Sequence, residues 1–277
     1  MQFSDILLTV DYDRTLTAPD STIPQRNLDA IRYFMDNGGT FTMNTGRSVN
    51  TMGDLFQRIP VNAPFLLYNG SAVYENGVLT EVHTIDLDLW QTMDEVHRQF
   101  PELNLEIQGA DTHYLYAAKP EYEAFYDTIG WGHTPAVPGA EVGPFMKFSM
   151  FGKVRENTVD HMFRGEPGEI ARFDEAERWI MNRYGDKVDT FRAAPRILDV
   201  HAKGVSKIRS ARALQKRLGK KILVCIGDAE NDISMLDGAD YAFCPADGVV
   251  AHRYPNVCPC ADGAVADVIY NELPKLL

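Results

Sequence analysis

The chain has 277 residues, of which 45% are hydrophobic, and this length supports one large or two ordinary folded domains. Its formal net charge of −12 at pH 7 disfavours binding to nucleic acid or to an anionic membrane, because both require a basic surface. A small anionic substrate is compatible with this charge only where local cations reverse its sign.

The N-terminal stretch and the cysteines favour a cytoplasmic protein. The first residues, MQFSDILLTVDYD, contain no basic leader, and their apolar run is only as long as one strand, so we expect neither a signal peptide nor a membrane span. The cysteines lie in the last quarter of the chain and lack the paired C-x-x-C spacing of a zinc site. We expect reduced, mostly buried thiols at Cys225, Cys244, Cys258 and Cys260.

A strand followed by two aspartates comes first. Ile6–Val10 (ILLTV) consists of apolar or β-favouring residues, which is typical of a strand buried on both faces of a parallel sheet. Asp11 and Asp13 follow, and side chains two residues apart on extended backbone point to the same side. Carboxylates this close repel each other unless a cation or a proton lies between them. Considered alone, an aspartate-rich turn without chemistry explains the stretch equally well.

Helices and strands then alternate, and a polar segment ends the second strand. Thr45-Gly46-Arg47 follows this strand, where a hydroxyl and backbone N–H groups are suited to holding an anion, although Thr45 is also a good helix cap. The alternation predicts a parallel sheet with helices on both faces. The predicted elements are a helix from about Pro24 to Gly38, a strand at 40–44, a helix carrying Met52, Leu55, Phe56 and Ile59, a strand at 65–68, and a hairpin at 72–79 around Glu75-Asn76-Gly77.

The middle of the chain has a different pattern. Strand-like and helical stretches mix without strict alternation, which predicts an inserted α+β domain at 83–187 and a first domain built from 1–82 and 188–277. The predicted elements are a helix with Leu89, Met93 and Val96, strands at 103–108, 114–118 and 145–151, and helices around Thr158–Phe163 and Asp174–Tyr184.

In the last third of the chain, predicted strands and helices alternate again. Polar groups again follow a buried strand, because Ile222–Ile226 (ILVCI) ends in GDAEND at 227–232. A helix begins at Lys207, within the segment KGVSK. The remaining predicted elements are strands at 187–191, 197–200 and 241–243 and a last helix at 263–273.

These strand ends predict one shared site. Parallel strands of a doubly wound sheet direct their carboxyl ends to one edge, so residues far apart in sequence meet there. Clustered carboxylates need a divalent cation, and oxygen ligands point to Mg²⁺. An aspartate nucleophile, a second aspartate as proton donor, a cation and a lysine suit phosphoryl transfer through an aspartyl-phosphate. The expected members are Asp11, Asp13, Thr45, Lys207, Asp228, Asn231 and Asp232.

The same residues resemble the haloacid dehalogenase (HAD) superfamily. DYDRTL is similar to its DxDxT signature, and TGR at 45–47, GVSK at 204–207 and GDAEND at 227–232 match its other three motifs in order. The insertion resembles the type IIB cap of the Cof-type phosphatases. The resemblance therefore implies a Rossmann-like α/β core with an inserted α+β cap that selects the substrate. Arg14 departs from it, because these proteins usually have glycine there.

Roles follow from the resemblance by position. It implies Asp11 as nucleophile and metal ligand, and Asp13 as general acid and base with its backbone carbonyl on Mg²⁺. Asp228 would be the third metal ligand, and Asp232 a ligand through water or a partner of Lys207. Thr45 and Lys207 would bind phosphoryl oxygens, with Gly46, Arg47 and Asn231 at the substrate, while Lys203 is expected in solvent.

The expected function is Mg²⁺-dependent hydrolysis of a small phosphorylated metabolite, foremost a sugar phosphate, by a monomer or homodimer. A phosphosugar mutase with the same aspartyl-phosphate chemistry and a non-catalytic phosphometabolite sensor are the alternatives. A pure sensor has no need of both a nucleophile and an acid. Within the cap, candidates for substrate contact are His113, Tyr114, Tyr116, Trp131 and His133, although each of them also suits the cap's own core.

Overall fold

The computed structural model describes residues 2–155 and 164–276, so the helix predicted around Thr158–Phe163 lies outside the described residues. The chain divides into two compact units, which are described separately. Unit 1 comprises Met1–Gly46, Asp54–Thr80 and Ser206–Leu277, and unit 2 comprises Arg47–Gly53 and Glu81–Val205.

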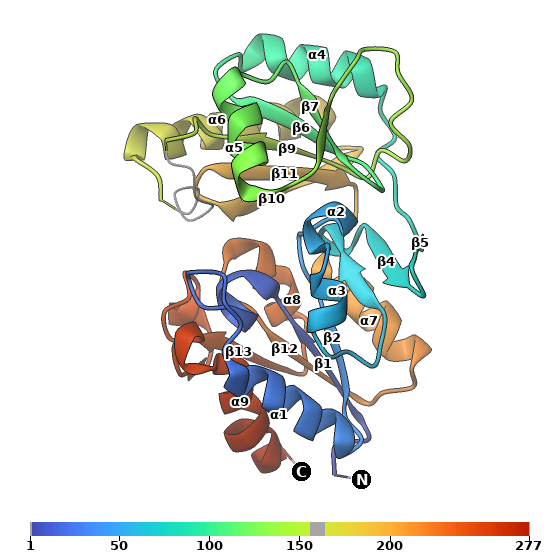
Figure 1. The fold of residues 1–277 in the computed structure, drawn as a ribbon, viewed down its shortest axis with the longest axis vertical. Helices are drawn as coiled ribbons and strands as arrows, with labels where there is room; N and C mark the ends of the chain where they lie inside the picture. Colours follow the sequence, from blue (N-terminus) through green and yellow to red (C-terminus); the bar gives the residue numbers. More distant parts are fainter. Residues whose placement is uncertain (1, 156–163, 277) are drawn as a thin grey trace. The chain divides into compact units, whose positions relative to one another are not determined.

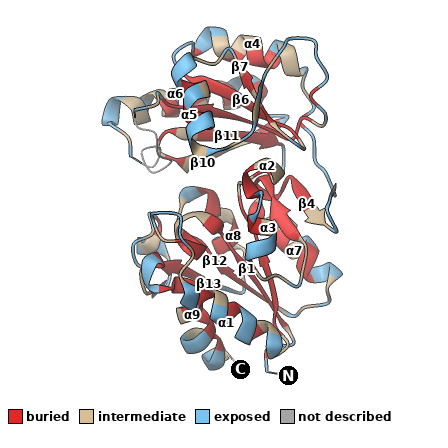
Figure 2. Ribbon diagram, viewed as in Figure 1, coloured by how far each residue is buried: buried red, intermediate tan, exposed pale blue. Residues whose placement is uncertain are grey.

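Unit 1 is built on a five-stranded parallel sheet with the order β14-β13-β12-β1-β2. β1, which lies between β12 and β2, is buried along its whole length, as the run ILLTV predicts (Figure 2). Val10 lies beside Ile226 on one side and Met43 on the other, so neighbouring strands end at the same level. The strands are β1 (Ile6–Val10), β2 (Thr40–Met43), β12 (Ile222–Ile226), β13 (Tyr241–Pro245) and β14 (Asn256–Val257).

A small antiparallel sheet adjoins this core. It consists of β3 (Phe65–Leu67), β4 (Ala72–Glu75) and β5 (Val78–Thr80), and a parallel bridge between Asn44 and Leu66 connects it to the end of β2. The predicted hairpin is confirmed, because Asn76 and Gly77 both have positive φ, as a two-residue hairpin turn requires.

Helices lie on both faces of the parallel sheet (Figure 1). α7 and α8 pack against the face that carries Leu7, Leu223 and Cys225. The helix predicted from Met52 to Ile59 is wrong as one element, because Gly53, with φ +43°, separates two short helices. The helices are α1 (Gln25–Asp36), α2 (Val49–Met52), α3 (Leu55–Arg58), α7 (Lys207–Arg217), α8 (Ile233–Asp237) and α9 (Ala264–Asp267); α2 belongs to unit 2.

Unit 2 is an α+β unit with a mixed six-stranded sheet in the order β10-β11-β9-β6-β7-β8. Neighbouring strands are antiparallel, except that β8 runs parallel to β7. The strands are β6 (Asn104–Gln108), β7 (His113–Tyr116), β8 (His133–Pro135), β9 (Lys147–Phe151), β10 (Val188–Ala194) and β11 (Ile197–Ala202), and the helices are α4 (Leu89–Gln99), α5 (Pro120–Ile129) and α6 (Pro167–Tyr184).

The sheet of unit 2 extends further along the chain than predicted from the sequence, which placed residues 188–277 in the first domain. β10 and β11 instead pair with each other and with β9. Leu198 and Val200 pack into the core shared with α4 and α6, so β11 is an integral strand of unit 2. No helix among the residues 2–155 and 164–276 has the length and apolar character needed to cross a bilayer.

A strained turn joins β3 to β4 beside the start of α7. Tyr68, Asn69 and Gly70 have φ of 53°, 54° and 94°, a region that costs energy for residues with a side chain. A Cβ on Gly70 would lie 2.5 Å from the backbone oxygen of Ser206, the residue that caps α7. Glycine is therefore required at position 70 both by its dihedral angle and by this close approach.

Gly70→Ala is expected to lower the free energy of unfolding by about 3 kcal/mol, because dihedral strain and a backbone clash add. Gly77→Ala is the matched control, since Gly77 has φ +84° but nothing within 4 Å of the added Cβ, and it should cost about 1 kcal/mol. Denaturant unfolding of both variants measures the difference. Equal losses would mean that the approach to Ser206 does not constrain the turn.

Candidate active site

The loop after β1 places Asp11 at the carboxyl edge of the sheet. Its backbone N–H donates to the Ile226 carbonyl at 3.0 Å, which continues the pairing of β1 with β12 by one residue. Asp11 is 6% exposed, and the next residues turn tightly, with Asp13 extended and Arg14 left-handed at φ +56°. Position 14 thus has a dihedral angle that glycine adopts without strain. Glycine is also the usual residue at this position in the proteins that the sequence resembles.

The second acidic loop follows β12. Asp232 Oδ2 accepts the backbone N–H groups of Asp228 and Ala229, at 3.0 and 3.1 Å, so this carboxylate organises its own loop. A Cβ on Gly227 would lie 2.5 Å from Asp232 Cγ, so only glycine leaves room for this side chain. Asp228 and Asp232 are 3% and 0% exposed.

Lys207 connects the two loops. It is the first residue of α7, behind the Ser206 cap, and its Nζ lies 2.6 Å from Asp11 Oδ1 and 2.6 Å from Asp232 Oδ1. Its side chain is fully buried. Lys203 is different, because its side chain is 48% exposed and pairs with Asp189 at 2.7 Å. The structure therefore brings Lys207, and not Lys203, to the aspartates of unit 1.

Burial and neighbouring charges shift the pKa values of the site residues in opposite directions. Burial raises the pKa of Asp11 to about 7, with contributions from the charges of Asp232 and Asp13, and Lys207 opposes this rise. Burial, followed by the charges of Asp232 and Asp11, raises the pKa of Asp228 well above its ordinary value. Burial lowers the pKa of Lys207, but Asp11 and Asp232 outweigh it and the net shift is upward. One ammonium does not neutralise this cluster of carboxylates, so the site favours additional positive charge.

The donor set fits a hard divalent cation. Asp11, Asp228 and Asp232 each offer a carboxylate oxygen, and these oxygens lie within 4.8 Å of one another. All three residues are buried, and oxygen donors without nitrogen or sulfur are those that Mg²⁺ prefers. Asp232 also holds Lys207, which is one of the two roles expected for it. The side chain of Asp13, expected to bind metal through its backbone carbonyl, is not in this set.

Thr45 and Gly46 follow β2 and lie beside the turn that follows β3. Asn69 donates its backbone N–H to Thr45 O at 2.9 Å, and its Oδ1 accepts from Asn231 Nδ2 at 3.4 Å. A Cβ on Gly46 would lie 2.9 Å from Asn69 Oδ1, so the segments carrying Thr45 and Asn231 meet at one buried asparagine. Thr45 does not cap the next helix, because the cap of α2 is Ser48.

Three residues that contribute hydrogen bonds to the site were not predicted from the sequence. Thr15 Oγ1 donates to Asp228 Oδ1 at 2.8 Å, and Asn44 Nδ2 donates to Lys207 O at 2.8 Å, which ties the end of β2 to the start of α7. Asn69 is the third. Asn44 and Asn69 are polar residues at or just past the ends of buried strands, which is the signal that identified Asp11 and Asp228.

Arg47 is placed with unit 2. Its Nη1 donates to Thr51 O at 3.0 Å, and its guanidinium lies 5.9 Å from the ring centre of Trp131. Among the predicted site residues, Thr45 and Gly46 thus pack within unit 1, whereas the residue that follows them packs within unit 2.

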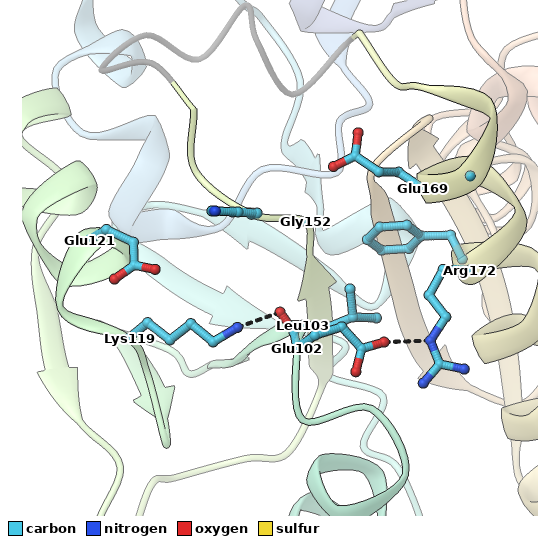
Figure 3. A pocket seen from close by; sticks show the side chains of 10 residues that line it. Glu102, Leu103, Lys119, Glu121, Gly152, Glu169 and Arg172 are labelled. Atoms are coloured by element: carbon cyan, nitrogen blue, oxygen red, sulfur yellow. Dashed lines mark hydrogen bonds and ion pairs between the residues drawn. The ribbon is translucent and has the colours of Figure 1, made fainter.

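Unit 2 also contains a pocket of about 500 Å³, and none of the predicted site residues lines it (Figure 3). At its wall, Lys119 donates to the Glu102 carbonyl and Arg172 pairs with the Glu102 carboxylate. The wall consists of Glu102, Leu103, Lys119, Glu121, Gly152, Lys153, Gly168, Glu169, Arg172 and Phe173.

Comparisons with known proteins agree with this architecture. A family model described as haloacid dehalogenase-like hydrolase matches residues 8–251. An HMP-PP phosphatase of Enterobacter sp. (strain 638) is 24% identical and covers 83% of this chain and 80% of its own length. The 5-amino-6-(5-phospho-D-ribitylamino)uracil phosphatase YcsE of Bacillus subtilis is 22% identical, with 84% and 80% covered.

Solved structures share the fold. The HAD subclass IIB sugar phosphatase BT4131 superposes with a TM-score of 0.76 at 18% sequence identity, covering 95% of this chain and 97% of that one. The five-stranded parallel sheet of unit 1 and the separate mixed sheet of unit 2 are the core and the cap expected from the sequence. The chain belongs to the haloacid dehalogenase-like hydrolases, and its fold is similar to that of the subclass IIB structure.

Proposed function

We propose that this chain hydrolyses the phosphoric monoester of a small metabolite through a phosphoryl group carried on Asp11. The observation that carries the proposal is the position of Lys207, whose Nζ lies 2.6 Å from both Asp11 and Asp232. A buried ammonium beside one aspartate, at the edge where parallel strands end, supplies charge where a phosphate ester would bind.

The first displacement forms the bond between Asp11 and phosphorus. A carboxylate oxygen of Asp11 attacks phosphorus, the bond from phosphorus to the leaving oxygen breaks, and Asp13 gives its proton to that oxygen. In the second displacement, water attacks phosphorus and gives a proton to Asp13, and the bond to Asp11 breaks. Inorganic phosphate leaves, and Asp11 and Asp13 return to their starting states. Two displacements divide one very slow hydrolysis into two faster steps.

Hydrogen-bond donors would hold the phosphoryl oxygens. We assign this role to the Thr45 hydroxyl and the Lys207 ammonium, with Gly46 and Asn231 beside them. Contacts that support the assignment are those of Asn69 with Thr45 O and with Asn231. Donors fixed before the reaction stabilise the charge that develops in the transition state without reorganising. Arg47 is assigned to substrate binding.

Asp11 and Asp228 would hold Mg²⁺ through carboxylate oxygens, with the Asp13 backbone carbonyl as a further ligand and Asp232 supporting the site while holding Lys207. When bound, the cation would offset the negative charge of the carboxylates and of the phosphate. The clustered carboxylate oxygens of Asp11, Asp228 and Asp232 support this assignment.

The substrate class is a small phosphorylated metabolite, and a sugar phosphate is the first choice. Support comes from relatives named as phosphatases of HMP-PP and of a phosphoribitylaminouracil, and from the sugar phosphatase that shares the fold. Unit 1 would catalyse phosphoryl transfer, since the residues assigned to this step belong to it. Unit 2 would select the substrate.

Asp11→Asn is expected to lower kcat for p-nitrophenyl phosphate by at least about a thousandfold, because an amide oxygen is a poor nucleophile. Thermal unfolding should show an intact fold, since the amide retains an oxygen that accepts from Lys207. Asp29→Asn, at an exposed side chain of α1, is the control and should keep the wild-type rate. Substantial turnover by Asp11→Asn would contradict the assignment of the nucleophile.

Removal of divalent cations with a chelator should abolish turnover, and Mg²⁺ should restore it. Binding to the folded state also stabilises it, by about 2.7 kcal/mol when the ion is at a hundred times its Kd, so Mg²⁺ should raise Tm by several degrees. Asp228→Asn should remove most of this shift. A turnover rate that does not respond to the chelator would rule out the metal.

A further inference from the structure

On the central strands β6 and β9 of the six-stranded sheet of unit 2, both faces are buried; one is apolar, and the other carries a group of polar side chains. Leu105 and Ile107 of β6 pack with α4 and α6, whereas the alternate residue Glu106 faces the other way and is fully buried. Burial raises the pKa of Glu106 to about 7. A buried carboxyl needs hydrogen-bond donors, and α5 supplies two tyrosines. The polar residues on this face are Asn104, Glu106, Gln108, His113, Lys147, Ser149, Asp199 and His201.

A chain of hydrogen bonds runs from this carboxyl to the segment that carries Arg47. Tyr126 donates its hydroxyl to Glu106 Oε2. The Tyr126 oxygen lies 3.0 Å from His113 Nδ1, and His113 Nε2 lies 2.7 Å from Ser48 Oγ. Each of these four residues is at most 1% exposed. A chain this deeply buried keeps its geometry only while every member has its partner.

The donors and acceptors along this chain of hydrogen bonds follow from the bond at its end, between Tyr126 and Glu106. Because Tyr126 gives its proton to Glu106, its oxygen accepts from His113 Nδ1–H, and His113 Nε2 then accepts from the Ser48 hydroxyl. This assignment requires a neutral imidazole, and burial, followed by the charge of Lys147, lowers the pKa of His113 to about 3. Ser48 Oγ also accepts the Thr51 N–H at 3.1 Å, so the chain ends on the cap of α2.

Two further contacts hold the same segment within unit 2. Asn50 Nδ2 donates to Gly132 O at 2.6 Å, and the Arg47 guanidinium lies over Trp131, a ring that also contacts His113 and Tyr126. A single peptide bond, between Gly46 and Arg47, separates the residues that pack in unit 1 from those that pack in unit 2.

We propose that His113, with Tyr126 and Ser48, is a positioning residue that fixes Arg47 for binding the phosphate of the substrate. The inference rests on the proposed function, because it assigns a role in substrate binding to that same enzyme. The cap, through its buried hydrogen bonds, controls the last residue of the Thr45-Gly46-Arg47 segment, while the residues assigned to phosphoryl transfer do not depend on the chain. Loss of a link therefore weakens binding and leaves the chemical step nearly unchanged.

The two tyrosines of α5 offer a matched test. Tyr122 and Tyr126 are both fully buried and both donate to Glu106 Oε2, but only Tyr126 contacts His113 through a hydrogen bond. Tyr126→Phe is expected to raise KM for p-nitrophenyl phosphate about fivefold, with kcat within twofold of wild type. Tyr122→Phe should leave both parameters within twofold. Calorimetric titration with inorganic phosphate should show the same fivefold loss for Tyr126→Phe alone.

A double-mutant cycle separates positioning from general damage. Arg47→Ala should raise KM, and Tyr126→Phe added to it should raise KM no further, because the chain acts through Arg47. Ser48→Ala, which removes the opposite end of the chain, should reproduce the effect of Tyr126→Phe and serves if that variant does not fold. Equal effects of the two tyrosine variants, or additive effects with Arg47→Ala, would overturn the inference.

The outcomes also distinguish this inference from the proposed function. Wild-type protein that hydrolyses the ester, together with indistinguishable tyrosine variants, overturns only the positioning role. Wild-type protein that neither hydrolyses the ester nor binds inorganic phosphate overturns the proposed function and this inference with it. If phosphate binds without turnover, the calorimetric comparison of the tyrosine variants still decides the positioning role.

Discussion

The ion pairs of Lys207 with Asp11 and Asp232 are the interaction on which the site depends. They join the loops that follow β1 and β12 to the first residue of α7, through Nζ to oxygen distances of 2.6 Å. Desolvation of an isolated ammonium or carboxylate is costly, so each group is tolerated at this depth only with the others present. Burial raises the pKa of Asp228 because it disfavours the charged form, and a bound cation would favour that charged form again. A cation bound here would reduce the repulsion among these carboxylates.

The residues at the strand ends were the part of the site that the sequence could predict, because short apolar runs indicate buried parallel strands. Ile6–Val10 and Ile222–Ile226 are strands with the predicted bounds; Asp11 follows the first directly, and Asp228 follows the second after Gly227. Asn44, Asn69 and Thr15 were missed because their roles are hydrogen bonds to other site residues. For Asn44 and Asn69, the strand-end position was the available signal, whereas Thr15 has no such signal. Asn69 also has a left-handed backbone, which its sequence does not reveal, and it contacts Thr45 and Asn231.

Unit 2 was harder to predict in detail. The Leu198, Asp199, Val200 alternation of β11 predicts a strand with two unlike faces but does not say which sheet receives it, and pairing with β9 decides this. α5 was missed although Pro120 begins it and Tyr122, Phe125, Tyr126 and Ile129 follow helical spacing. The cap candidates divide by strand alternation: Tyr114 and Tyr116 pack into the apolar core, while His113 joins the polar chain. Trp131 lies over Arg47, and His133 is near Asp127.

The central claim is that phosphoryl transfer passes through Asp11. Its most direct test is to quench the enzyme during turnover of p-nitrophenyl phosphate, reduce any acyl phosphate with borohydride, and locate the modified residue by mass spectrometry. The account predicts conversion of position 11 to homoserine, and of no other carboxylate. Modification of Asp13, Asp228 or Asp232 instead, or a covalent phosphate on a residue outside this cluster, would contradict it.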